Sequence, residues 1–227
     1  DIRTAASSAV AVNALAADAK FKIAILGSSS VARGHLHALY ATGRIESVRV
    51  YSPTPENREK FAHDFSELYG IDIEAVSSPE QAVQDSDVVV CASRSRDGGP
   101  VFKAEWLKPG MTIVSVSSTL PEQRELDVET MQRATLIVAD MPEEVLHETG
   151  DALAVKAAGD DIENKIVSLG DVISKKIIAR QKPDDILIYK SVGSALQDIV
   201  TAEMLLRNAR TESLFQDMPE SIVTIDR

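Results

Sequence analysis

A loop rich in glycine and serine is the first part of the chain whose residue types suit ligand binding. It reads Gly27-Ser28-Ser29-Ser30-Val31-Ala32. A dinucleotide-binding loop has Gly at its first and third positions and Gly or Ala at its sixth. Gly27 and Ala32 fit, and the Ser29 N–H and hydroxyl could still bind a phosphate oxygen at a helix N-terminus. The loop predicts a phosphate site, with an ordinary serine-rich turn as the alternative.

The segment expected to face the cofactor ribose carries no acid. A dinucleotide-binding fold commonly places Asp or Glu after its second strand, where the carboxylate binds the ribose hydroxyls of NAD. The corresponding segment is Tyr51-Ser52-Pro53-Thr54, with no acid before Glu56. Ser52, Thr54 and Arg58 could instead surround a 2′-phosphate, which a carboxylate would repel. We therefore expect NADP or NAD as cofactor, with NADP preferred; a turn with a helix cap is the alternative.

Alternating strand-like and helix-like runs must position these two segments. Short apolar runs predict strands, whereas apolar residues at helical spacing after capping signals predict helices. Strands that alternate with helices of this length form a parallel sheet covered on both faces. The predicted class is α/β, a Rossmann-type doubly wound parallel sheet with flanking helices. Strands are predicted at 21–26, 46–51, 71–76, 87–91, 111–116 and 135–139, and helices at 30–40, from 55, at 79–83 and at 127–134.

The first segment, residues 1–19, is rich in alanine. Alanine has the highest helix propensity, so the segment predicts a helix of about five turns. Because this helix begins at the first residue, which is Asp rather than Met, we expect further protein upstream. A helix that simply packs at the N-terminus is the alternative.

Composition excludes several classes of function. The chain has 227 residues, with 24 Lys plus Arg against 35 Asp plus Glu and a net charge of −11, which argues against a nucleic-acid partner. The single cysteine, Cys91, excludes a disulfide scaffold and fits a reducing, cytoplasmic location. No apolar run approaches the ~20 residues that span a bilayer, so no membrane partner is expected. His35 and His37 fall on different faces of a helix, and no metal site is expected.

Several stretches in a fixed order resemble the ornithine cyclodeaminase/mu-crystallin family. The resemblance extends over almost the whole chain, and it rests on the order and spacing of the stretches because none of them is specific alone. Besides the glycine loop, they are Arg3-Thr4-Ala5-Ala6, residues 51–58 (YSPTPENR), 121–127 (PEQRELD), 148–151 (ETGD), 169–173 (LGDVI) and 190–198 (KSVGSALQD).

This resemblance implies a homodimer with an N-terminal substrate and dimerisation domain followed by a nicotinamide-binding Rossmann domain. Most of that first domain would be missing from this sequence. Residues 1–19 would be a connecting helix, 20–190 the NAD(P)-binding domain, and 191–227 a C-terminal helix and tail returning to the substrate domain. On that last helix Ala195, Ile199, Ala202 and Leu206 share a face that core packing would explain.

The resemblance also assigns roles to individual residues. Arg3 matches a family arginine that reaches towards the substrate or a cofactor phosphate, although a solvated helix-face arginine is the alternative. Ser30 and Val31 occupy loop positions where the family commonly has a small residue and Gln, so Val31 is a departure. Ser93 stands where a Thr often borders the cofactor, and Val192 lies in a turn that packs near the nicotinamide.

The catalytic position departs from that of the cyclodeaminases. Their acid/base Asp corresponds to Thr119, and the family Lys that follows corresponds to Gln123. A threonine hydroxyl does not titrate near neutral pH and cannot act as a general base, but it can orient water or bind an imine. We therefore expect an imine or ketimine reductase, or an amino-acid dehydrogenase, acting on a small amino or imino acid with Thr119 and Arg3 near the substrate. An ornithine cyclodeaminase proper and a non-catalytic, crystallin-like cofactor-binding protein are the alternatives.

Overall fold

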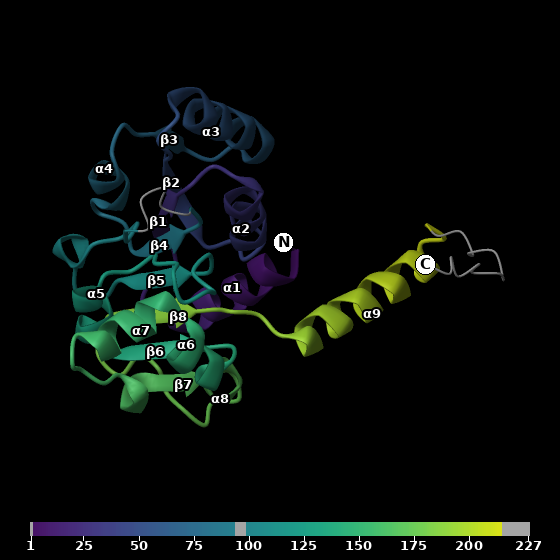
Figure 1. Ribbon diagram of the computed structural model, residues 1–227. Helices are drawn as coiled ribbons and strands as arrows, with labels where there is room; N and C mark the ends of the chain where they lie inside the picture. Colours follow the sequence, from purple (N-terminus) through teal and green to yellow (C-terminus); the bar gives the residue numbers. More distant parts are fainter. Residues whose placement is uncertain (1, 94–98, 215–227) are drawn as a thin grey trace, which may run out of the picture. The chain divides into compact units, whose positions relative to one another are not determined.

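The computed structural model of the protein describes residues 2–93 and 99–214 (Figure 1). Contacts divide the chain after Gly193 into two units, which are described separately. The first unit is the α/β domain and the second is built on one helix, α9 (Ala195–Thr211). In the described parts of the chain, no helix is both long enough and apolar enough to cross a lipid bilayer.

The first unit is built on an eight-stranded sheet in the order β3-β2-β1-β4-β5-β8-β6-β7, with every pairing parallel. This confirms the predicted fold class. The six predicted strands are present: β1 has the predicted bounds, β2 begins one residue earlier, and β3 to β6 are shorter by one to three residues. Strands β7 and β8 were not predicted. The strands are β1 (Phe21–Leu26), β2 (Ile45–Tyr51), β3 (Ile73–Ala75), β4 (Val88–Cys91), β5 (Thr112–Ser115), β6 (Leu136–Ala139), β7 (Ile166–Ser168) and β8 (Leu187–Lys190).

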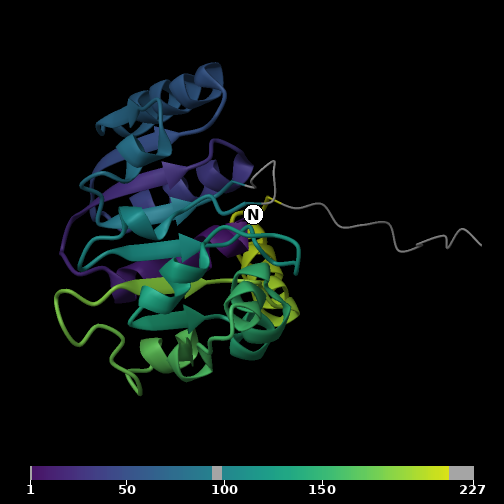
Figure 2. The same ribbon diagram turned by 60° about the vertical axis from the view of Figure 1, so that its left-hand side comes forward.

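Helices cover both faces of the sheet (Figures 1 and 2). Alternate strand residues point to opposite faces, so the sheet has two apolar clusters, one under each layer of helices. One layer holds α1 (Ile2–Leu15), α2 (Ser30–Tyr40), α3 (Pro55–Tyr69) and α8 (Leu169–Ile173), and the other holds α4 (Pro79–Val83), a 3₁₀ turn (Ala104–Trp106), α5 (Val128–Arg133) and α7 (Gly150–Ala157). Of the remaining elements, α6 is Pro142–Glu148 and a second 3₁₀ turn is Glu163–Lys165.

The first helix is shorter than predicted and is part of the core of the α/β unit. It ends at Leu15 rather than near Ala19. The Arg44 guanidinium binds the carbonyl oxygens of Asn13, Asp18 and Ala19, which gives those acceptors a partner outside the helix.

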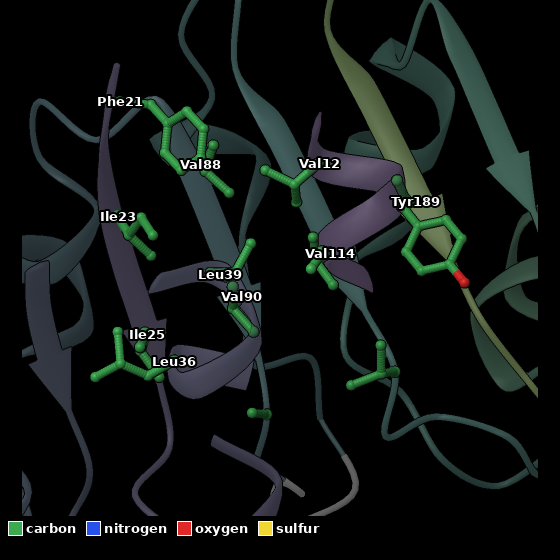
Figure 3. Close-up of a cluster of buried hydrophobic side chains, with 14 of the residues drawn as sticks. Val12, Phe21, Ile23, Ile25, Leu36, Leu39, Val88, Val90, Val114 and Tyr189 are labelled. Atoms are coloured by element: carbon green, nitrogen blue, oxygen red, sulfur yellow. The ribbon is translucent and has the colours of Figure 1, made fainter. Parts of the chain in front are cut away.

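The core under α1 shows how this helix is held. Figure 3 shows Val12 of α1 beside Val114 of β5 and Tyr189 of β8, and all three are fully buried. The Tyr189 hydroxyl hydrogen-bonds the Ser7 hydroxyl at 2.6 Å. The helix therefore packs directly on the middle of the sheet. The predicted domain boundary between residues 19 and 20 stays a prediction.

The second unit corrects one expectation. The face of α9 that carries Ala195, Ile199, Ala202 and Leu206 was expected to pack in a core, but along its described length α9 has no buried residue. Ile199 is 65% exposed and Leu206 is 48% exposed. Helical spacing marks a face suited to burial but supplies no partner, and within residues 194–214 the one helix has nothing to pack on. Residues 215–227 of the predicted C-terminal segment lie outside the described residues.

Candidate functional site

A cleft of about 1000 Å³ opens at the carboxyl ends of β1, β2, β4 and β5. In an open α/β sheet, ligands bind outside the carboxyl ends of the strands, at the point where the strand order reverses. Here that point lies between β1 and β4, because the chain runs outward from β1 to β3 and then returns to β4. The cleft therefore lies where this fold places a ligand.

The loop after β1 forms the first wall of the cleft. Gly27 has a φ of +134°, and a Cβ at this position would overlap the backbone carbonyl oxygen of Ala92. Ser29 is the N-cap residue of α2, yet its hydroxyl makes no capping hydrogen bond within the described chain. The N-terminus of α2 is thus left without a side-chain cap at the cleft, which suits a phosphate group.

Hydroxyl groups join this wall to the end of β2. The Ser28 Oγ donates to the Ser52 Oγ at 3.0 Å, and the Ser52 Oγ donates to the Thr54 carbonyl at 3.3 Å. Thr54 is the N-cap residue of α3, but among the described residues its hydroxyl caps nothing. The Arg58 Nη1 donates to the Ser52 carbonyl at 3.0 Å, which holds its guanidinium beside the cleft.

The segment that follows β5 forms the second wall. Ser117 and Thr119 line the cleft from this side. The Thr119 N–H donates to the Gln123 Oε1 at 3.2 Å, and the Ser118 Oγ donates to the Gln123 carbonyl at 2.8 Å. Gln123 therefore supports the segment that carries Thr119.

Three buried charged residues lie beneath the second wall. The Lys190 Nζ, on β8, lies 2.7 Å from the Asp151 Oδ2, on α7, and both side chains are fully buried. The Lys190 Nζ also donates to the Ser115 Oγ at 2.9 Å and to the Ser118 carbonyl at 2.8 Å. The Glu125 Oε2 accepts from the Ser115 Oγ at 2.6 Å. A hydroxyl thus joins the ion pair to a second buried carboxyl.

Burial dominates the ionisation of this cluster. It raises the pKa of Glu125 from its ordinary 4.5 to about 7, against the opposing effects of Lys190 and of the hydrogen bond from Ser115. Burial, together with the nearby Glu125 and Asp151, also raises the pKa of the Cys91 thiol well above its ordinary value. Cys91 is therefore an inert, buried thiol, as its position at the end of an apolar strand predicts.

Arg3 and Val192, both predicted to be site residues, lie together at the turn after β8. The Asp140 carboxylate accepts hydrogen bonds from the Ser191 hydroxyl at 2.7 Å and from the amides of Val192 and Gly193 at 3.0 and 2.8 Å. Gly193 has a φ of +83°, and a Cβ there would overlap the guanidinium of Arg3. Arg3 and Val192 are thus neighbours of this turn and are not among the residues that line the cleft.

The cleft brings together most of the residues singled out from the sequence. Arg58 adjoins it through Ser52. Within the described ranges, no group of three or more His, Cys, Asp or Glu side chains is arranged to hold a metal ion. The predicted residues that line the cleft are Gly27, Ser29, Ser30, Val31, Ser52, Thr54, Ser93 and Thr119.

Sequence reasoning missed other residues of the site. Thr4, Ser28, Asn57 and Ser117 also line the cleft. Ser117 follows the fifth strand, so the rule that ligands lie at the carboxyl ends of strands would have found it. The buried charges had no such signal, because a lysine that ends an apolar strand does not reveal which distant carboxylate it meets.

Comparison with known proteins shows the family. The profile of the ornithine cyclodeaminase/mu-crystallin family matches residues 1–213. The chain belongs to this family.

Individual relatives agree with this assignment. The chain is 33% identical over 209 residues to a Delta(1)-pyrroline-2-carboxylate reductase of Bacillus cereus, covering 92% of this chain and 63% of the relative. It is 36% identical over 203 residues to the ketimine reductase mu-crystallin of Mus musculus, covering 89% and 60%. The chain thus spans about three fifths of the length of these curated relatives.

A solved structure has the same arrangement of elements. It is the Delta(1)-pyrroline-2-carboxylate reductase of Thermococcus litoralis, in complex with NADH and L-proline. It superposes with a TM-score of 0.88 at 33% identity, covering 95% of this chain and 66% of that one.

Proposed function

We propose that the protein is an NAD(P)-dependent oxidoreductase, an imine or ketimine reductase or amino-acid dehydrogenase, acting on the C–N bond of a small amino or imino acid. One observation carries the proposal. A single cleft joins the uncapped N-terminus of α2 to a second wall that presents a Thr119 hydroxyl rather than a carboxylate. The reductase activities named for the relatives from Bacillus cereus, Mus musculus and Thermococcus litoralis support it.

The first wall fits a dinucleotide. Gly27 lets the backbone turn tightly against Ala92, where a Cβ would not fit, and the amides of Ser29, Ser30 and Val31 begin α2 beside the cleft. These residues would hold the phosphates, and Ser93 would border the nicotinamide end. When bound, a nicotinamide dinucleotide supplies hydride chemistry, while the protein supplies orientation and electrostatics.

The second wall and Arg3 would hold the substrate. The Thr119 hydroxyl would donate a hydrogen bond to the substrate or orient a water molecule, and the Arg3 guanidinium would bind a carboxylate by its planar fork. Because a threonine hydroxyl does not exchange protons near neutral pH, this wall does not favour cyclising deamination of ornithine. Val192 belongs to the turn beside Arg3 and would pack near the nicotinamide.

The deciding experiment follows nicotinamide absorbance with the full chain and a panel of cyclic imines, with ornithine as a separate substrate. We expect oxidation of NADPH with at least one imine and no deamination of ornithine. Thr119→Val, which keeps the shape but removes the hydroxyl, should lower kcat/KM by about tenfold, the loss of about one hydrogen bond. Thr211→Val on the exposed face of α9 is the matched control and should leave kcat/KM unchanged. Tight NADPH binding with no turnover would instead indicate a non-catalytic cofactor-binding protein.

The preference for NADP over NAD is part of the proposal. The Arg58 guanidinium donates to the Ser52 carbonyl at the end of β2, so it is placed to meet a 2′-phosphate there. Arg58→Ala should weaken NADPH binding by about tenfold, or about 1.4 kcal/mol, and leave NADH binding within about twofold. Equal affinities of the unmodified protein for both cofactors, unchanged by Arg58→Ala, would overturn the preference.

The homodimer and the cytoplasmic location complete the proposal. Both come from the sequence: the dimer from the family resemblance, through a domain upstream of this sequence, and the location from the single cysteine. Light scattering of the full-length protein, with that domain included, tests the dimer, and a monomer at micromolar concentration would contradict it.

A further inference from the structure

The ammonium group of Lys190 is fully buried and is surrounded by oxygen atoms of the protein. An ammonium group has three protons. The three oxygen atoms around Nζ belong to Asp151, Ser115 and Ser118, at 2.7, 2.9 and 2.8 Å. Two of these contacts are hydrogen bonds and the third is an ion pair, and the side chain is fully buried. Any effect of Lys190 on the cleft therefore passes through the atoms it contacts.

Those atoms lie directly behind the second wall. The register of the sheet places Cys91, Ser115 and Lys190 side by side as the last residues of β4, β5 and β8. Asp151 completes the floor from α7, since its Oδ1 accepts from the amides of Glu125 and Leu126 at 2.9 and 3.1 Å. Four separate elements, β4, β5, β8 and α7, thus meet under one short segment.

Two backbone groups of that segment are bound by opposite charges. The Ser118 carbonyl accepts from the Lys190 ammonium at 2.8 Å, and the Ser117 N–H donates to the Glu125 Oε2 at 3.0 Å. Hydrogen bonds with one ionised partner are roughly twice as strong as neutral ones. Ser117 and Thr119, on either side of Ser118, both line the cleft. The orientation of this wall is therefore fixed from below.

We propose that Lys190, Asp151 and Glu125 are positioning residues that hold residues 117–119 in the orientation the cleft needs, and that protonation of Glu125 loosens this hold. The proposal rests on the proposed function for the role of Thr119, but the hold itself is a property of the chain alone. Its consequence is that the second wall responds to pH whereas the first wall does not.

The charges around Glu125 explain why it titrates near neutral pH. Lys190 faces it from β8, Asp151 from α7 and the neutral Cys91 thiol from β4, and the Ser115 hydroxyl and Ser117 amide donate to it. One ammonium cannot balance two buried carboxylates, so burial raises the pKa of Glu125 to about 7. Below that pH the carboxyl is neutral and is a weaker acceptor for the Ser117 amide.

Amide NMR of Ser117 tests the inference without any need for turnover. Its chemical shift in the full chain is followed from about pH 5 to pH 9, a range that brackets the titration of Glu125. We expect one titration with a midpoint near pH 7 in the unmodified protein, and a flat profile in Glu125→Gln, which has the same shape and no titrating proton. Glu122→Gln, an exposed change of the same kind three residues earlier, is the matched control and should keep the titration.

A second variant tests the bridging hydroxyl. The hydrogen bond from Ser115 lowers the pKa of Glu125, so Ser115→Ala should move the Ser117 midpoint above that of the unmodified protein. A flat Ser117 profile in the unmodified protein, a titration that persists in Glu125→Gln, or a midpoint that Ser115→Ala lowers would each overturn the inference. None of these outcomes depends on catalysis, so the inference can fail while the reductase proposal stands, and the reverse.

Discussion

The two walls of the cleft are built in different ways. The wall after β1 is held by backbone conformation, with Gly27 at a φ of +134° and an uncapped helix N-terminus, and its side chains are uncharged hydroxyls. The wall after β5 is held by Lys190, Asp151 and Glu125, all buried. The first wall depends on residues that are close in sequence, whereas the second depends on residues brought together by the whole sheet. Substitutions in the first wall should therefore change mainly ligand affinity, and substitutions in the second wall should change mainly folding stability.

Loss of the Lys190 ammonium should have the largest effect. Lys190→Met leaves Asp151 buried without its partner, which typically costs about 3–5 kcal/mol. Whole domains are stable by about 5–15 kcal/mol, so the variant should be largely unfolded at modest urea concentration. Urea unfolding monitored by circular dichroism measures the loss.

A double variant separates charge from packing. Lys190→Met/Asp151→Asn removes both charges, and the Asn oxygen still accepts from the Glu125 and Leu126 amides. It should recover more than half of the stability lost by Lys190→Met, because no unpaired charge is left in the core. A double variant as unstable as Lys190→Met would show that packing around the lysine stem, rather than charge, fixes the second wall.

The pH dependence of stability should be the next largest effect. Between pH 4.5 and about 7 the folded chain keeps a proton on Glu125 that the unfolded chain has released, so raising the pH removes stability. At about 1.4 kcal/mol per pH unit, this amounts to about 3 kcal/mol. From about pH 4.5 to pH 8 the unmodified protein should therefore lose about 3 kcal/mol more stability than Glu125→Gln. Glu122→Gln should behave as the unmodified protein, and equal pH profiles for all three would contradict a neutral Glu125 in the folded chain.

A change in the first wall should act on ligand binding more than on folding. Gly27→Ala forces a strained φ and a contact with the Ala92 carbonyl, with a cost of about 1–3 kcal/mol in stability. The loop must shift, so NADPH binding should fall by more than about tenfold, or about 1.4 kcal/mol. Gly43→Ala, also at positive φ but with no atom near its Cβ, is the control: it should lose stability without losing affinity.

The smallest effect is expected at the hydrogen-bonded hydroxyls of Ser28 and Ser52. Ser28→Ala removes the hydrogen bond to the Ser52 Oγ and should cost about 1 kcal/mol or less. Thermal unfolding measures it, and the Ser117 titration should not move. A shift of that titration by Ser28→Ala would mean that the two walls are coupled rather than independent.

The sequence predicts the first half of the sheet well. The glycine loop, Pro55 at the start of α3, and the apolar runs from Phe21 to Cys91 are local signals, and each is found where it was predicted. It does not predict β8, because residues 187–190 form a short run whose place between β5 and β6 depends on pairing with segments about 50 to 75 residues earlier.

The same division holds for the candidate site. Gly27 and Ser29 follow from the pattern of the loop after the first strand and Thr54 from the segment after the second, and all three line the cleft. Glu125 and Asp151 look like ordinary solvated acids in the sequence, since nothing in their neighbours shows that Lys190 will lie close to both. The role of Arg3 stays a prediction of the resemblance, and the structure places its guanidinium beside the turn at Gly193.

The position of β8 bears on the order in which the protein is made. It is the last strand of the described chain, yet β5 and β6 hydrogen-bond to it and are joined through it. Without residues 187–190, β5 and β6 have no strand between them, so the sheet can form only as two separate pieces, β3-β2-β1-β4-β5 and β6-β7. A nascent chain that stops short of Leu187 can complete the wall at Gly27 but lacks the lysine that holds the wall at Thr119. The cleft is therefore finished by almost the last residues of the domain to be translated.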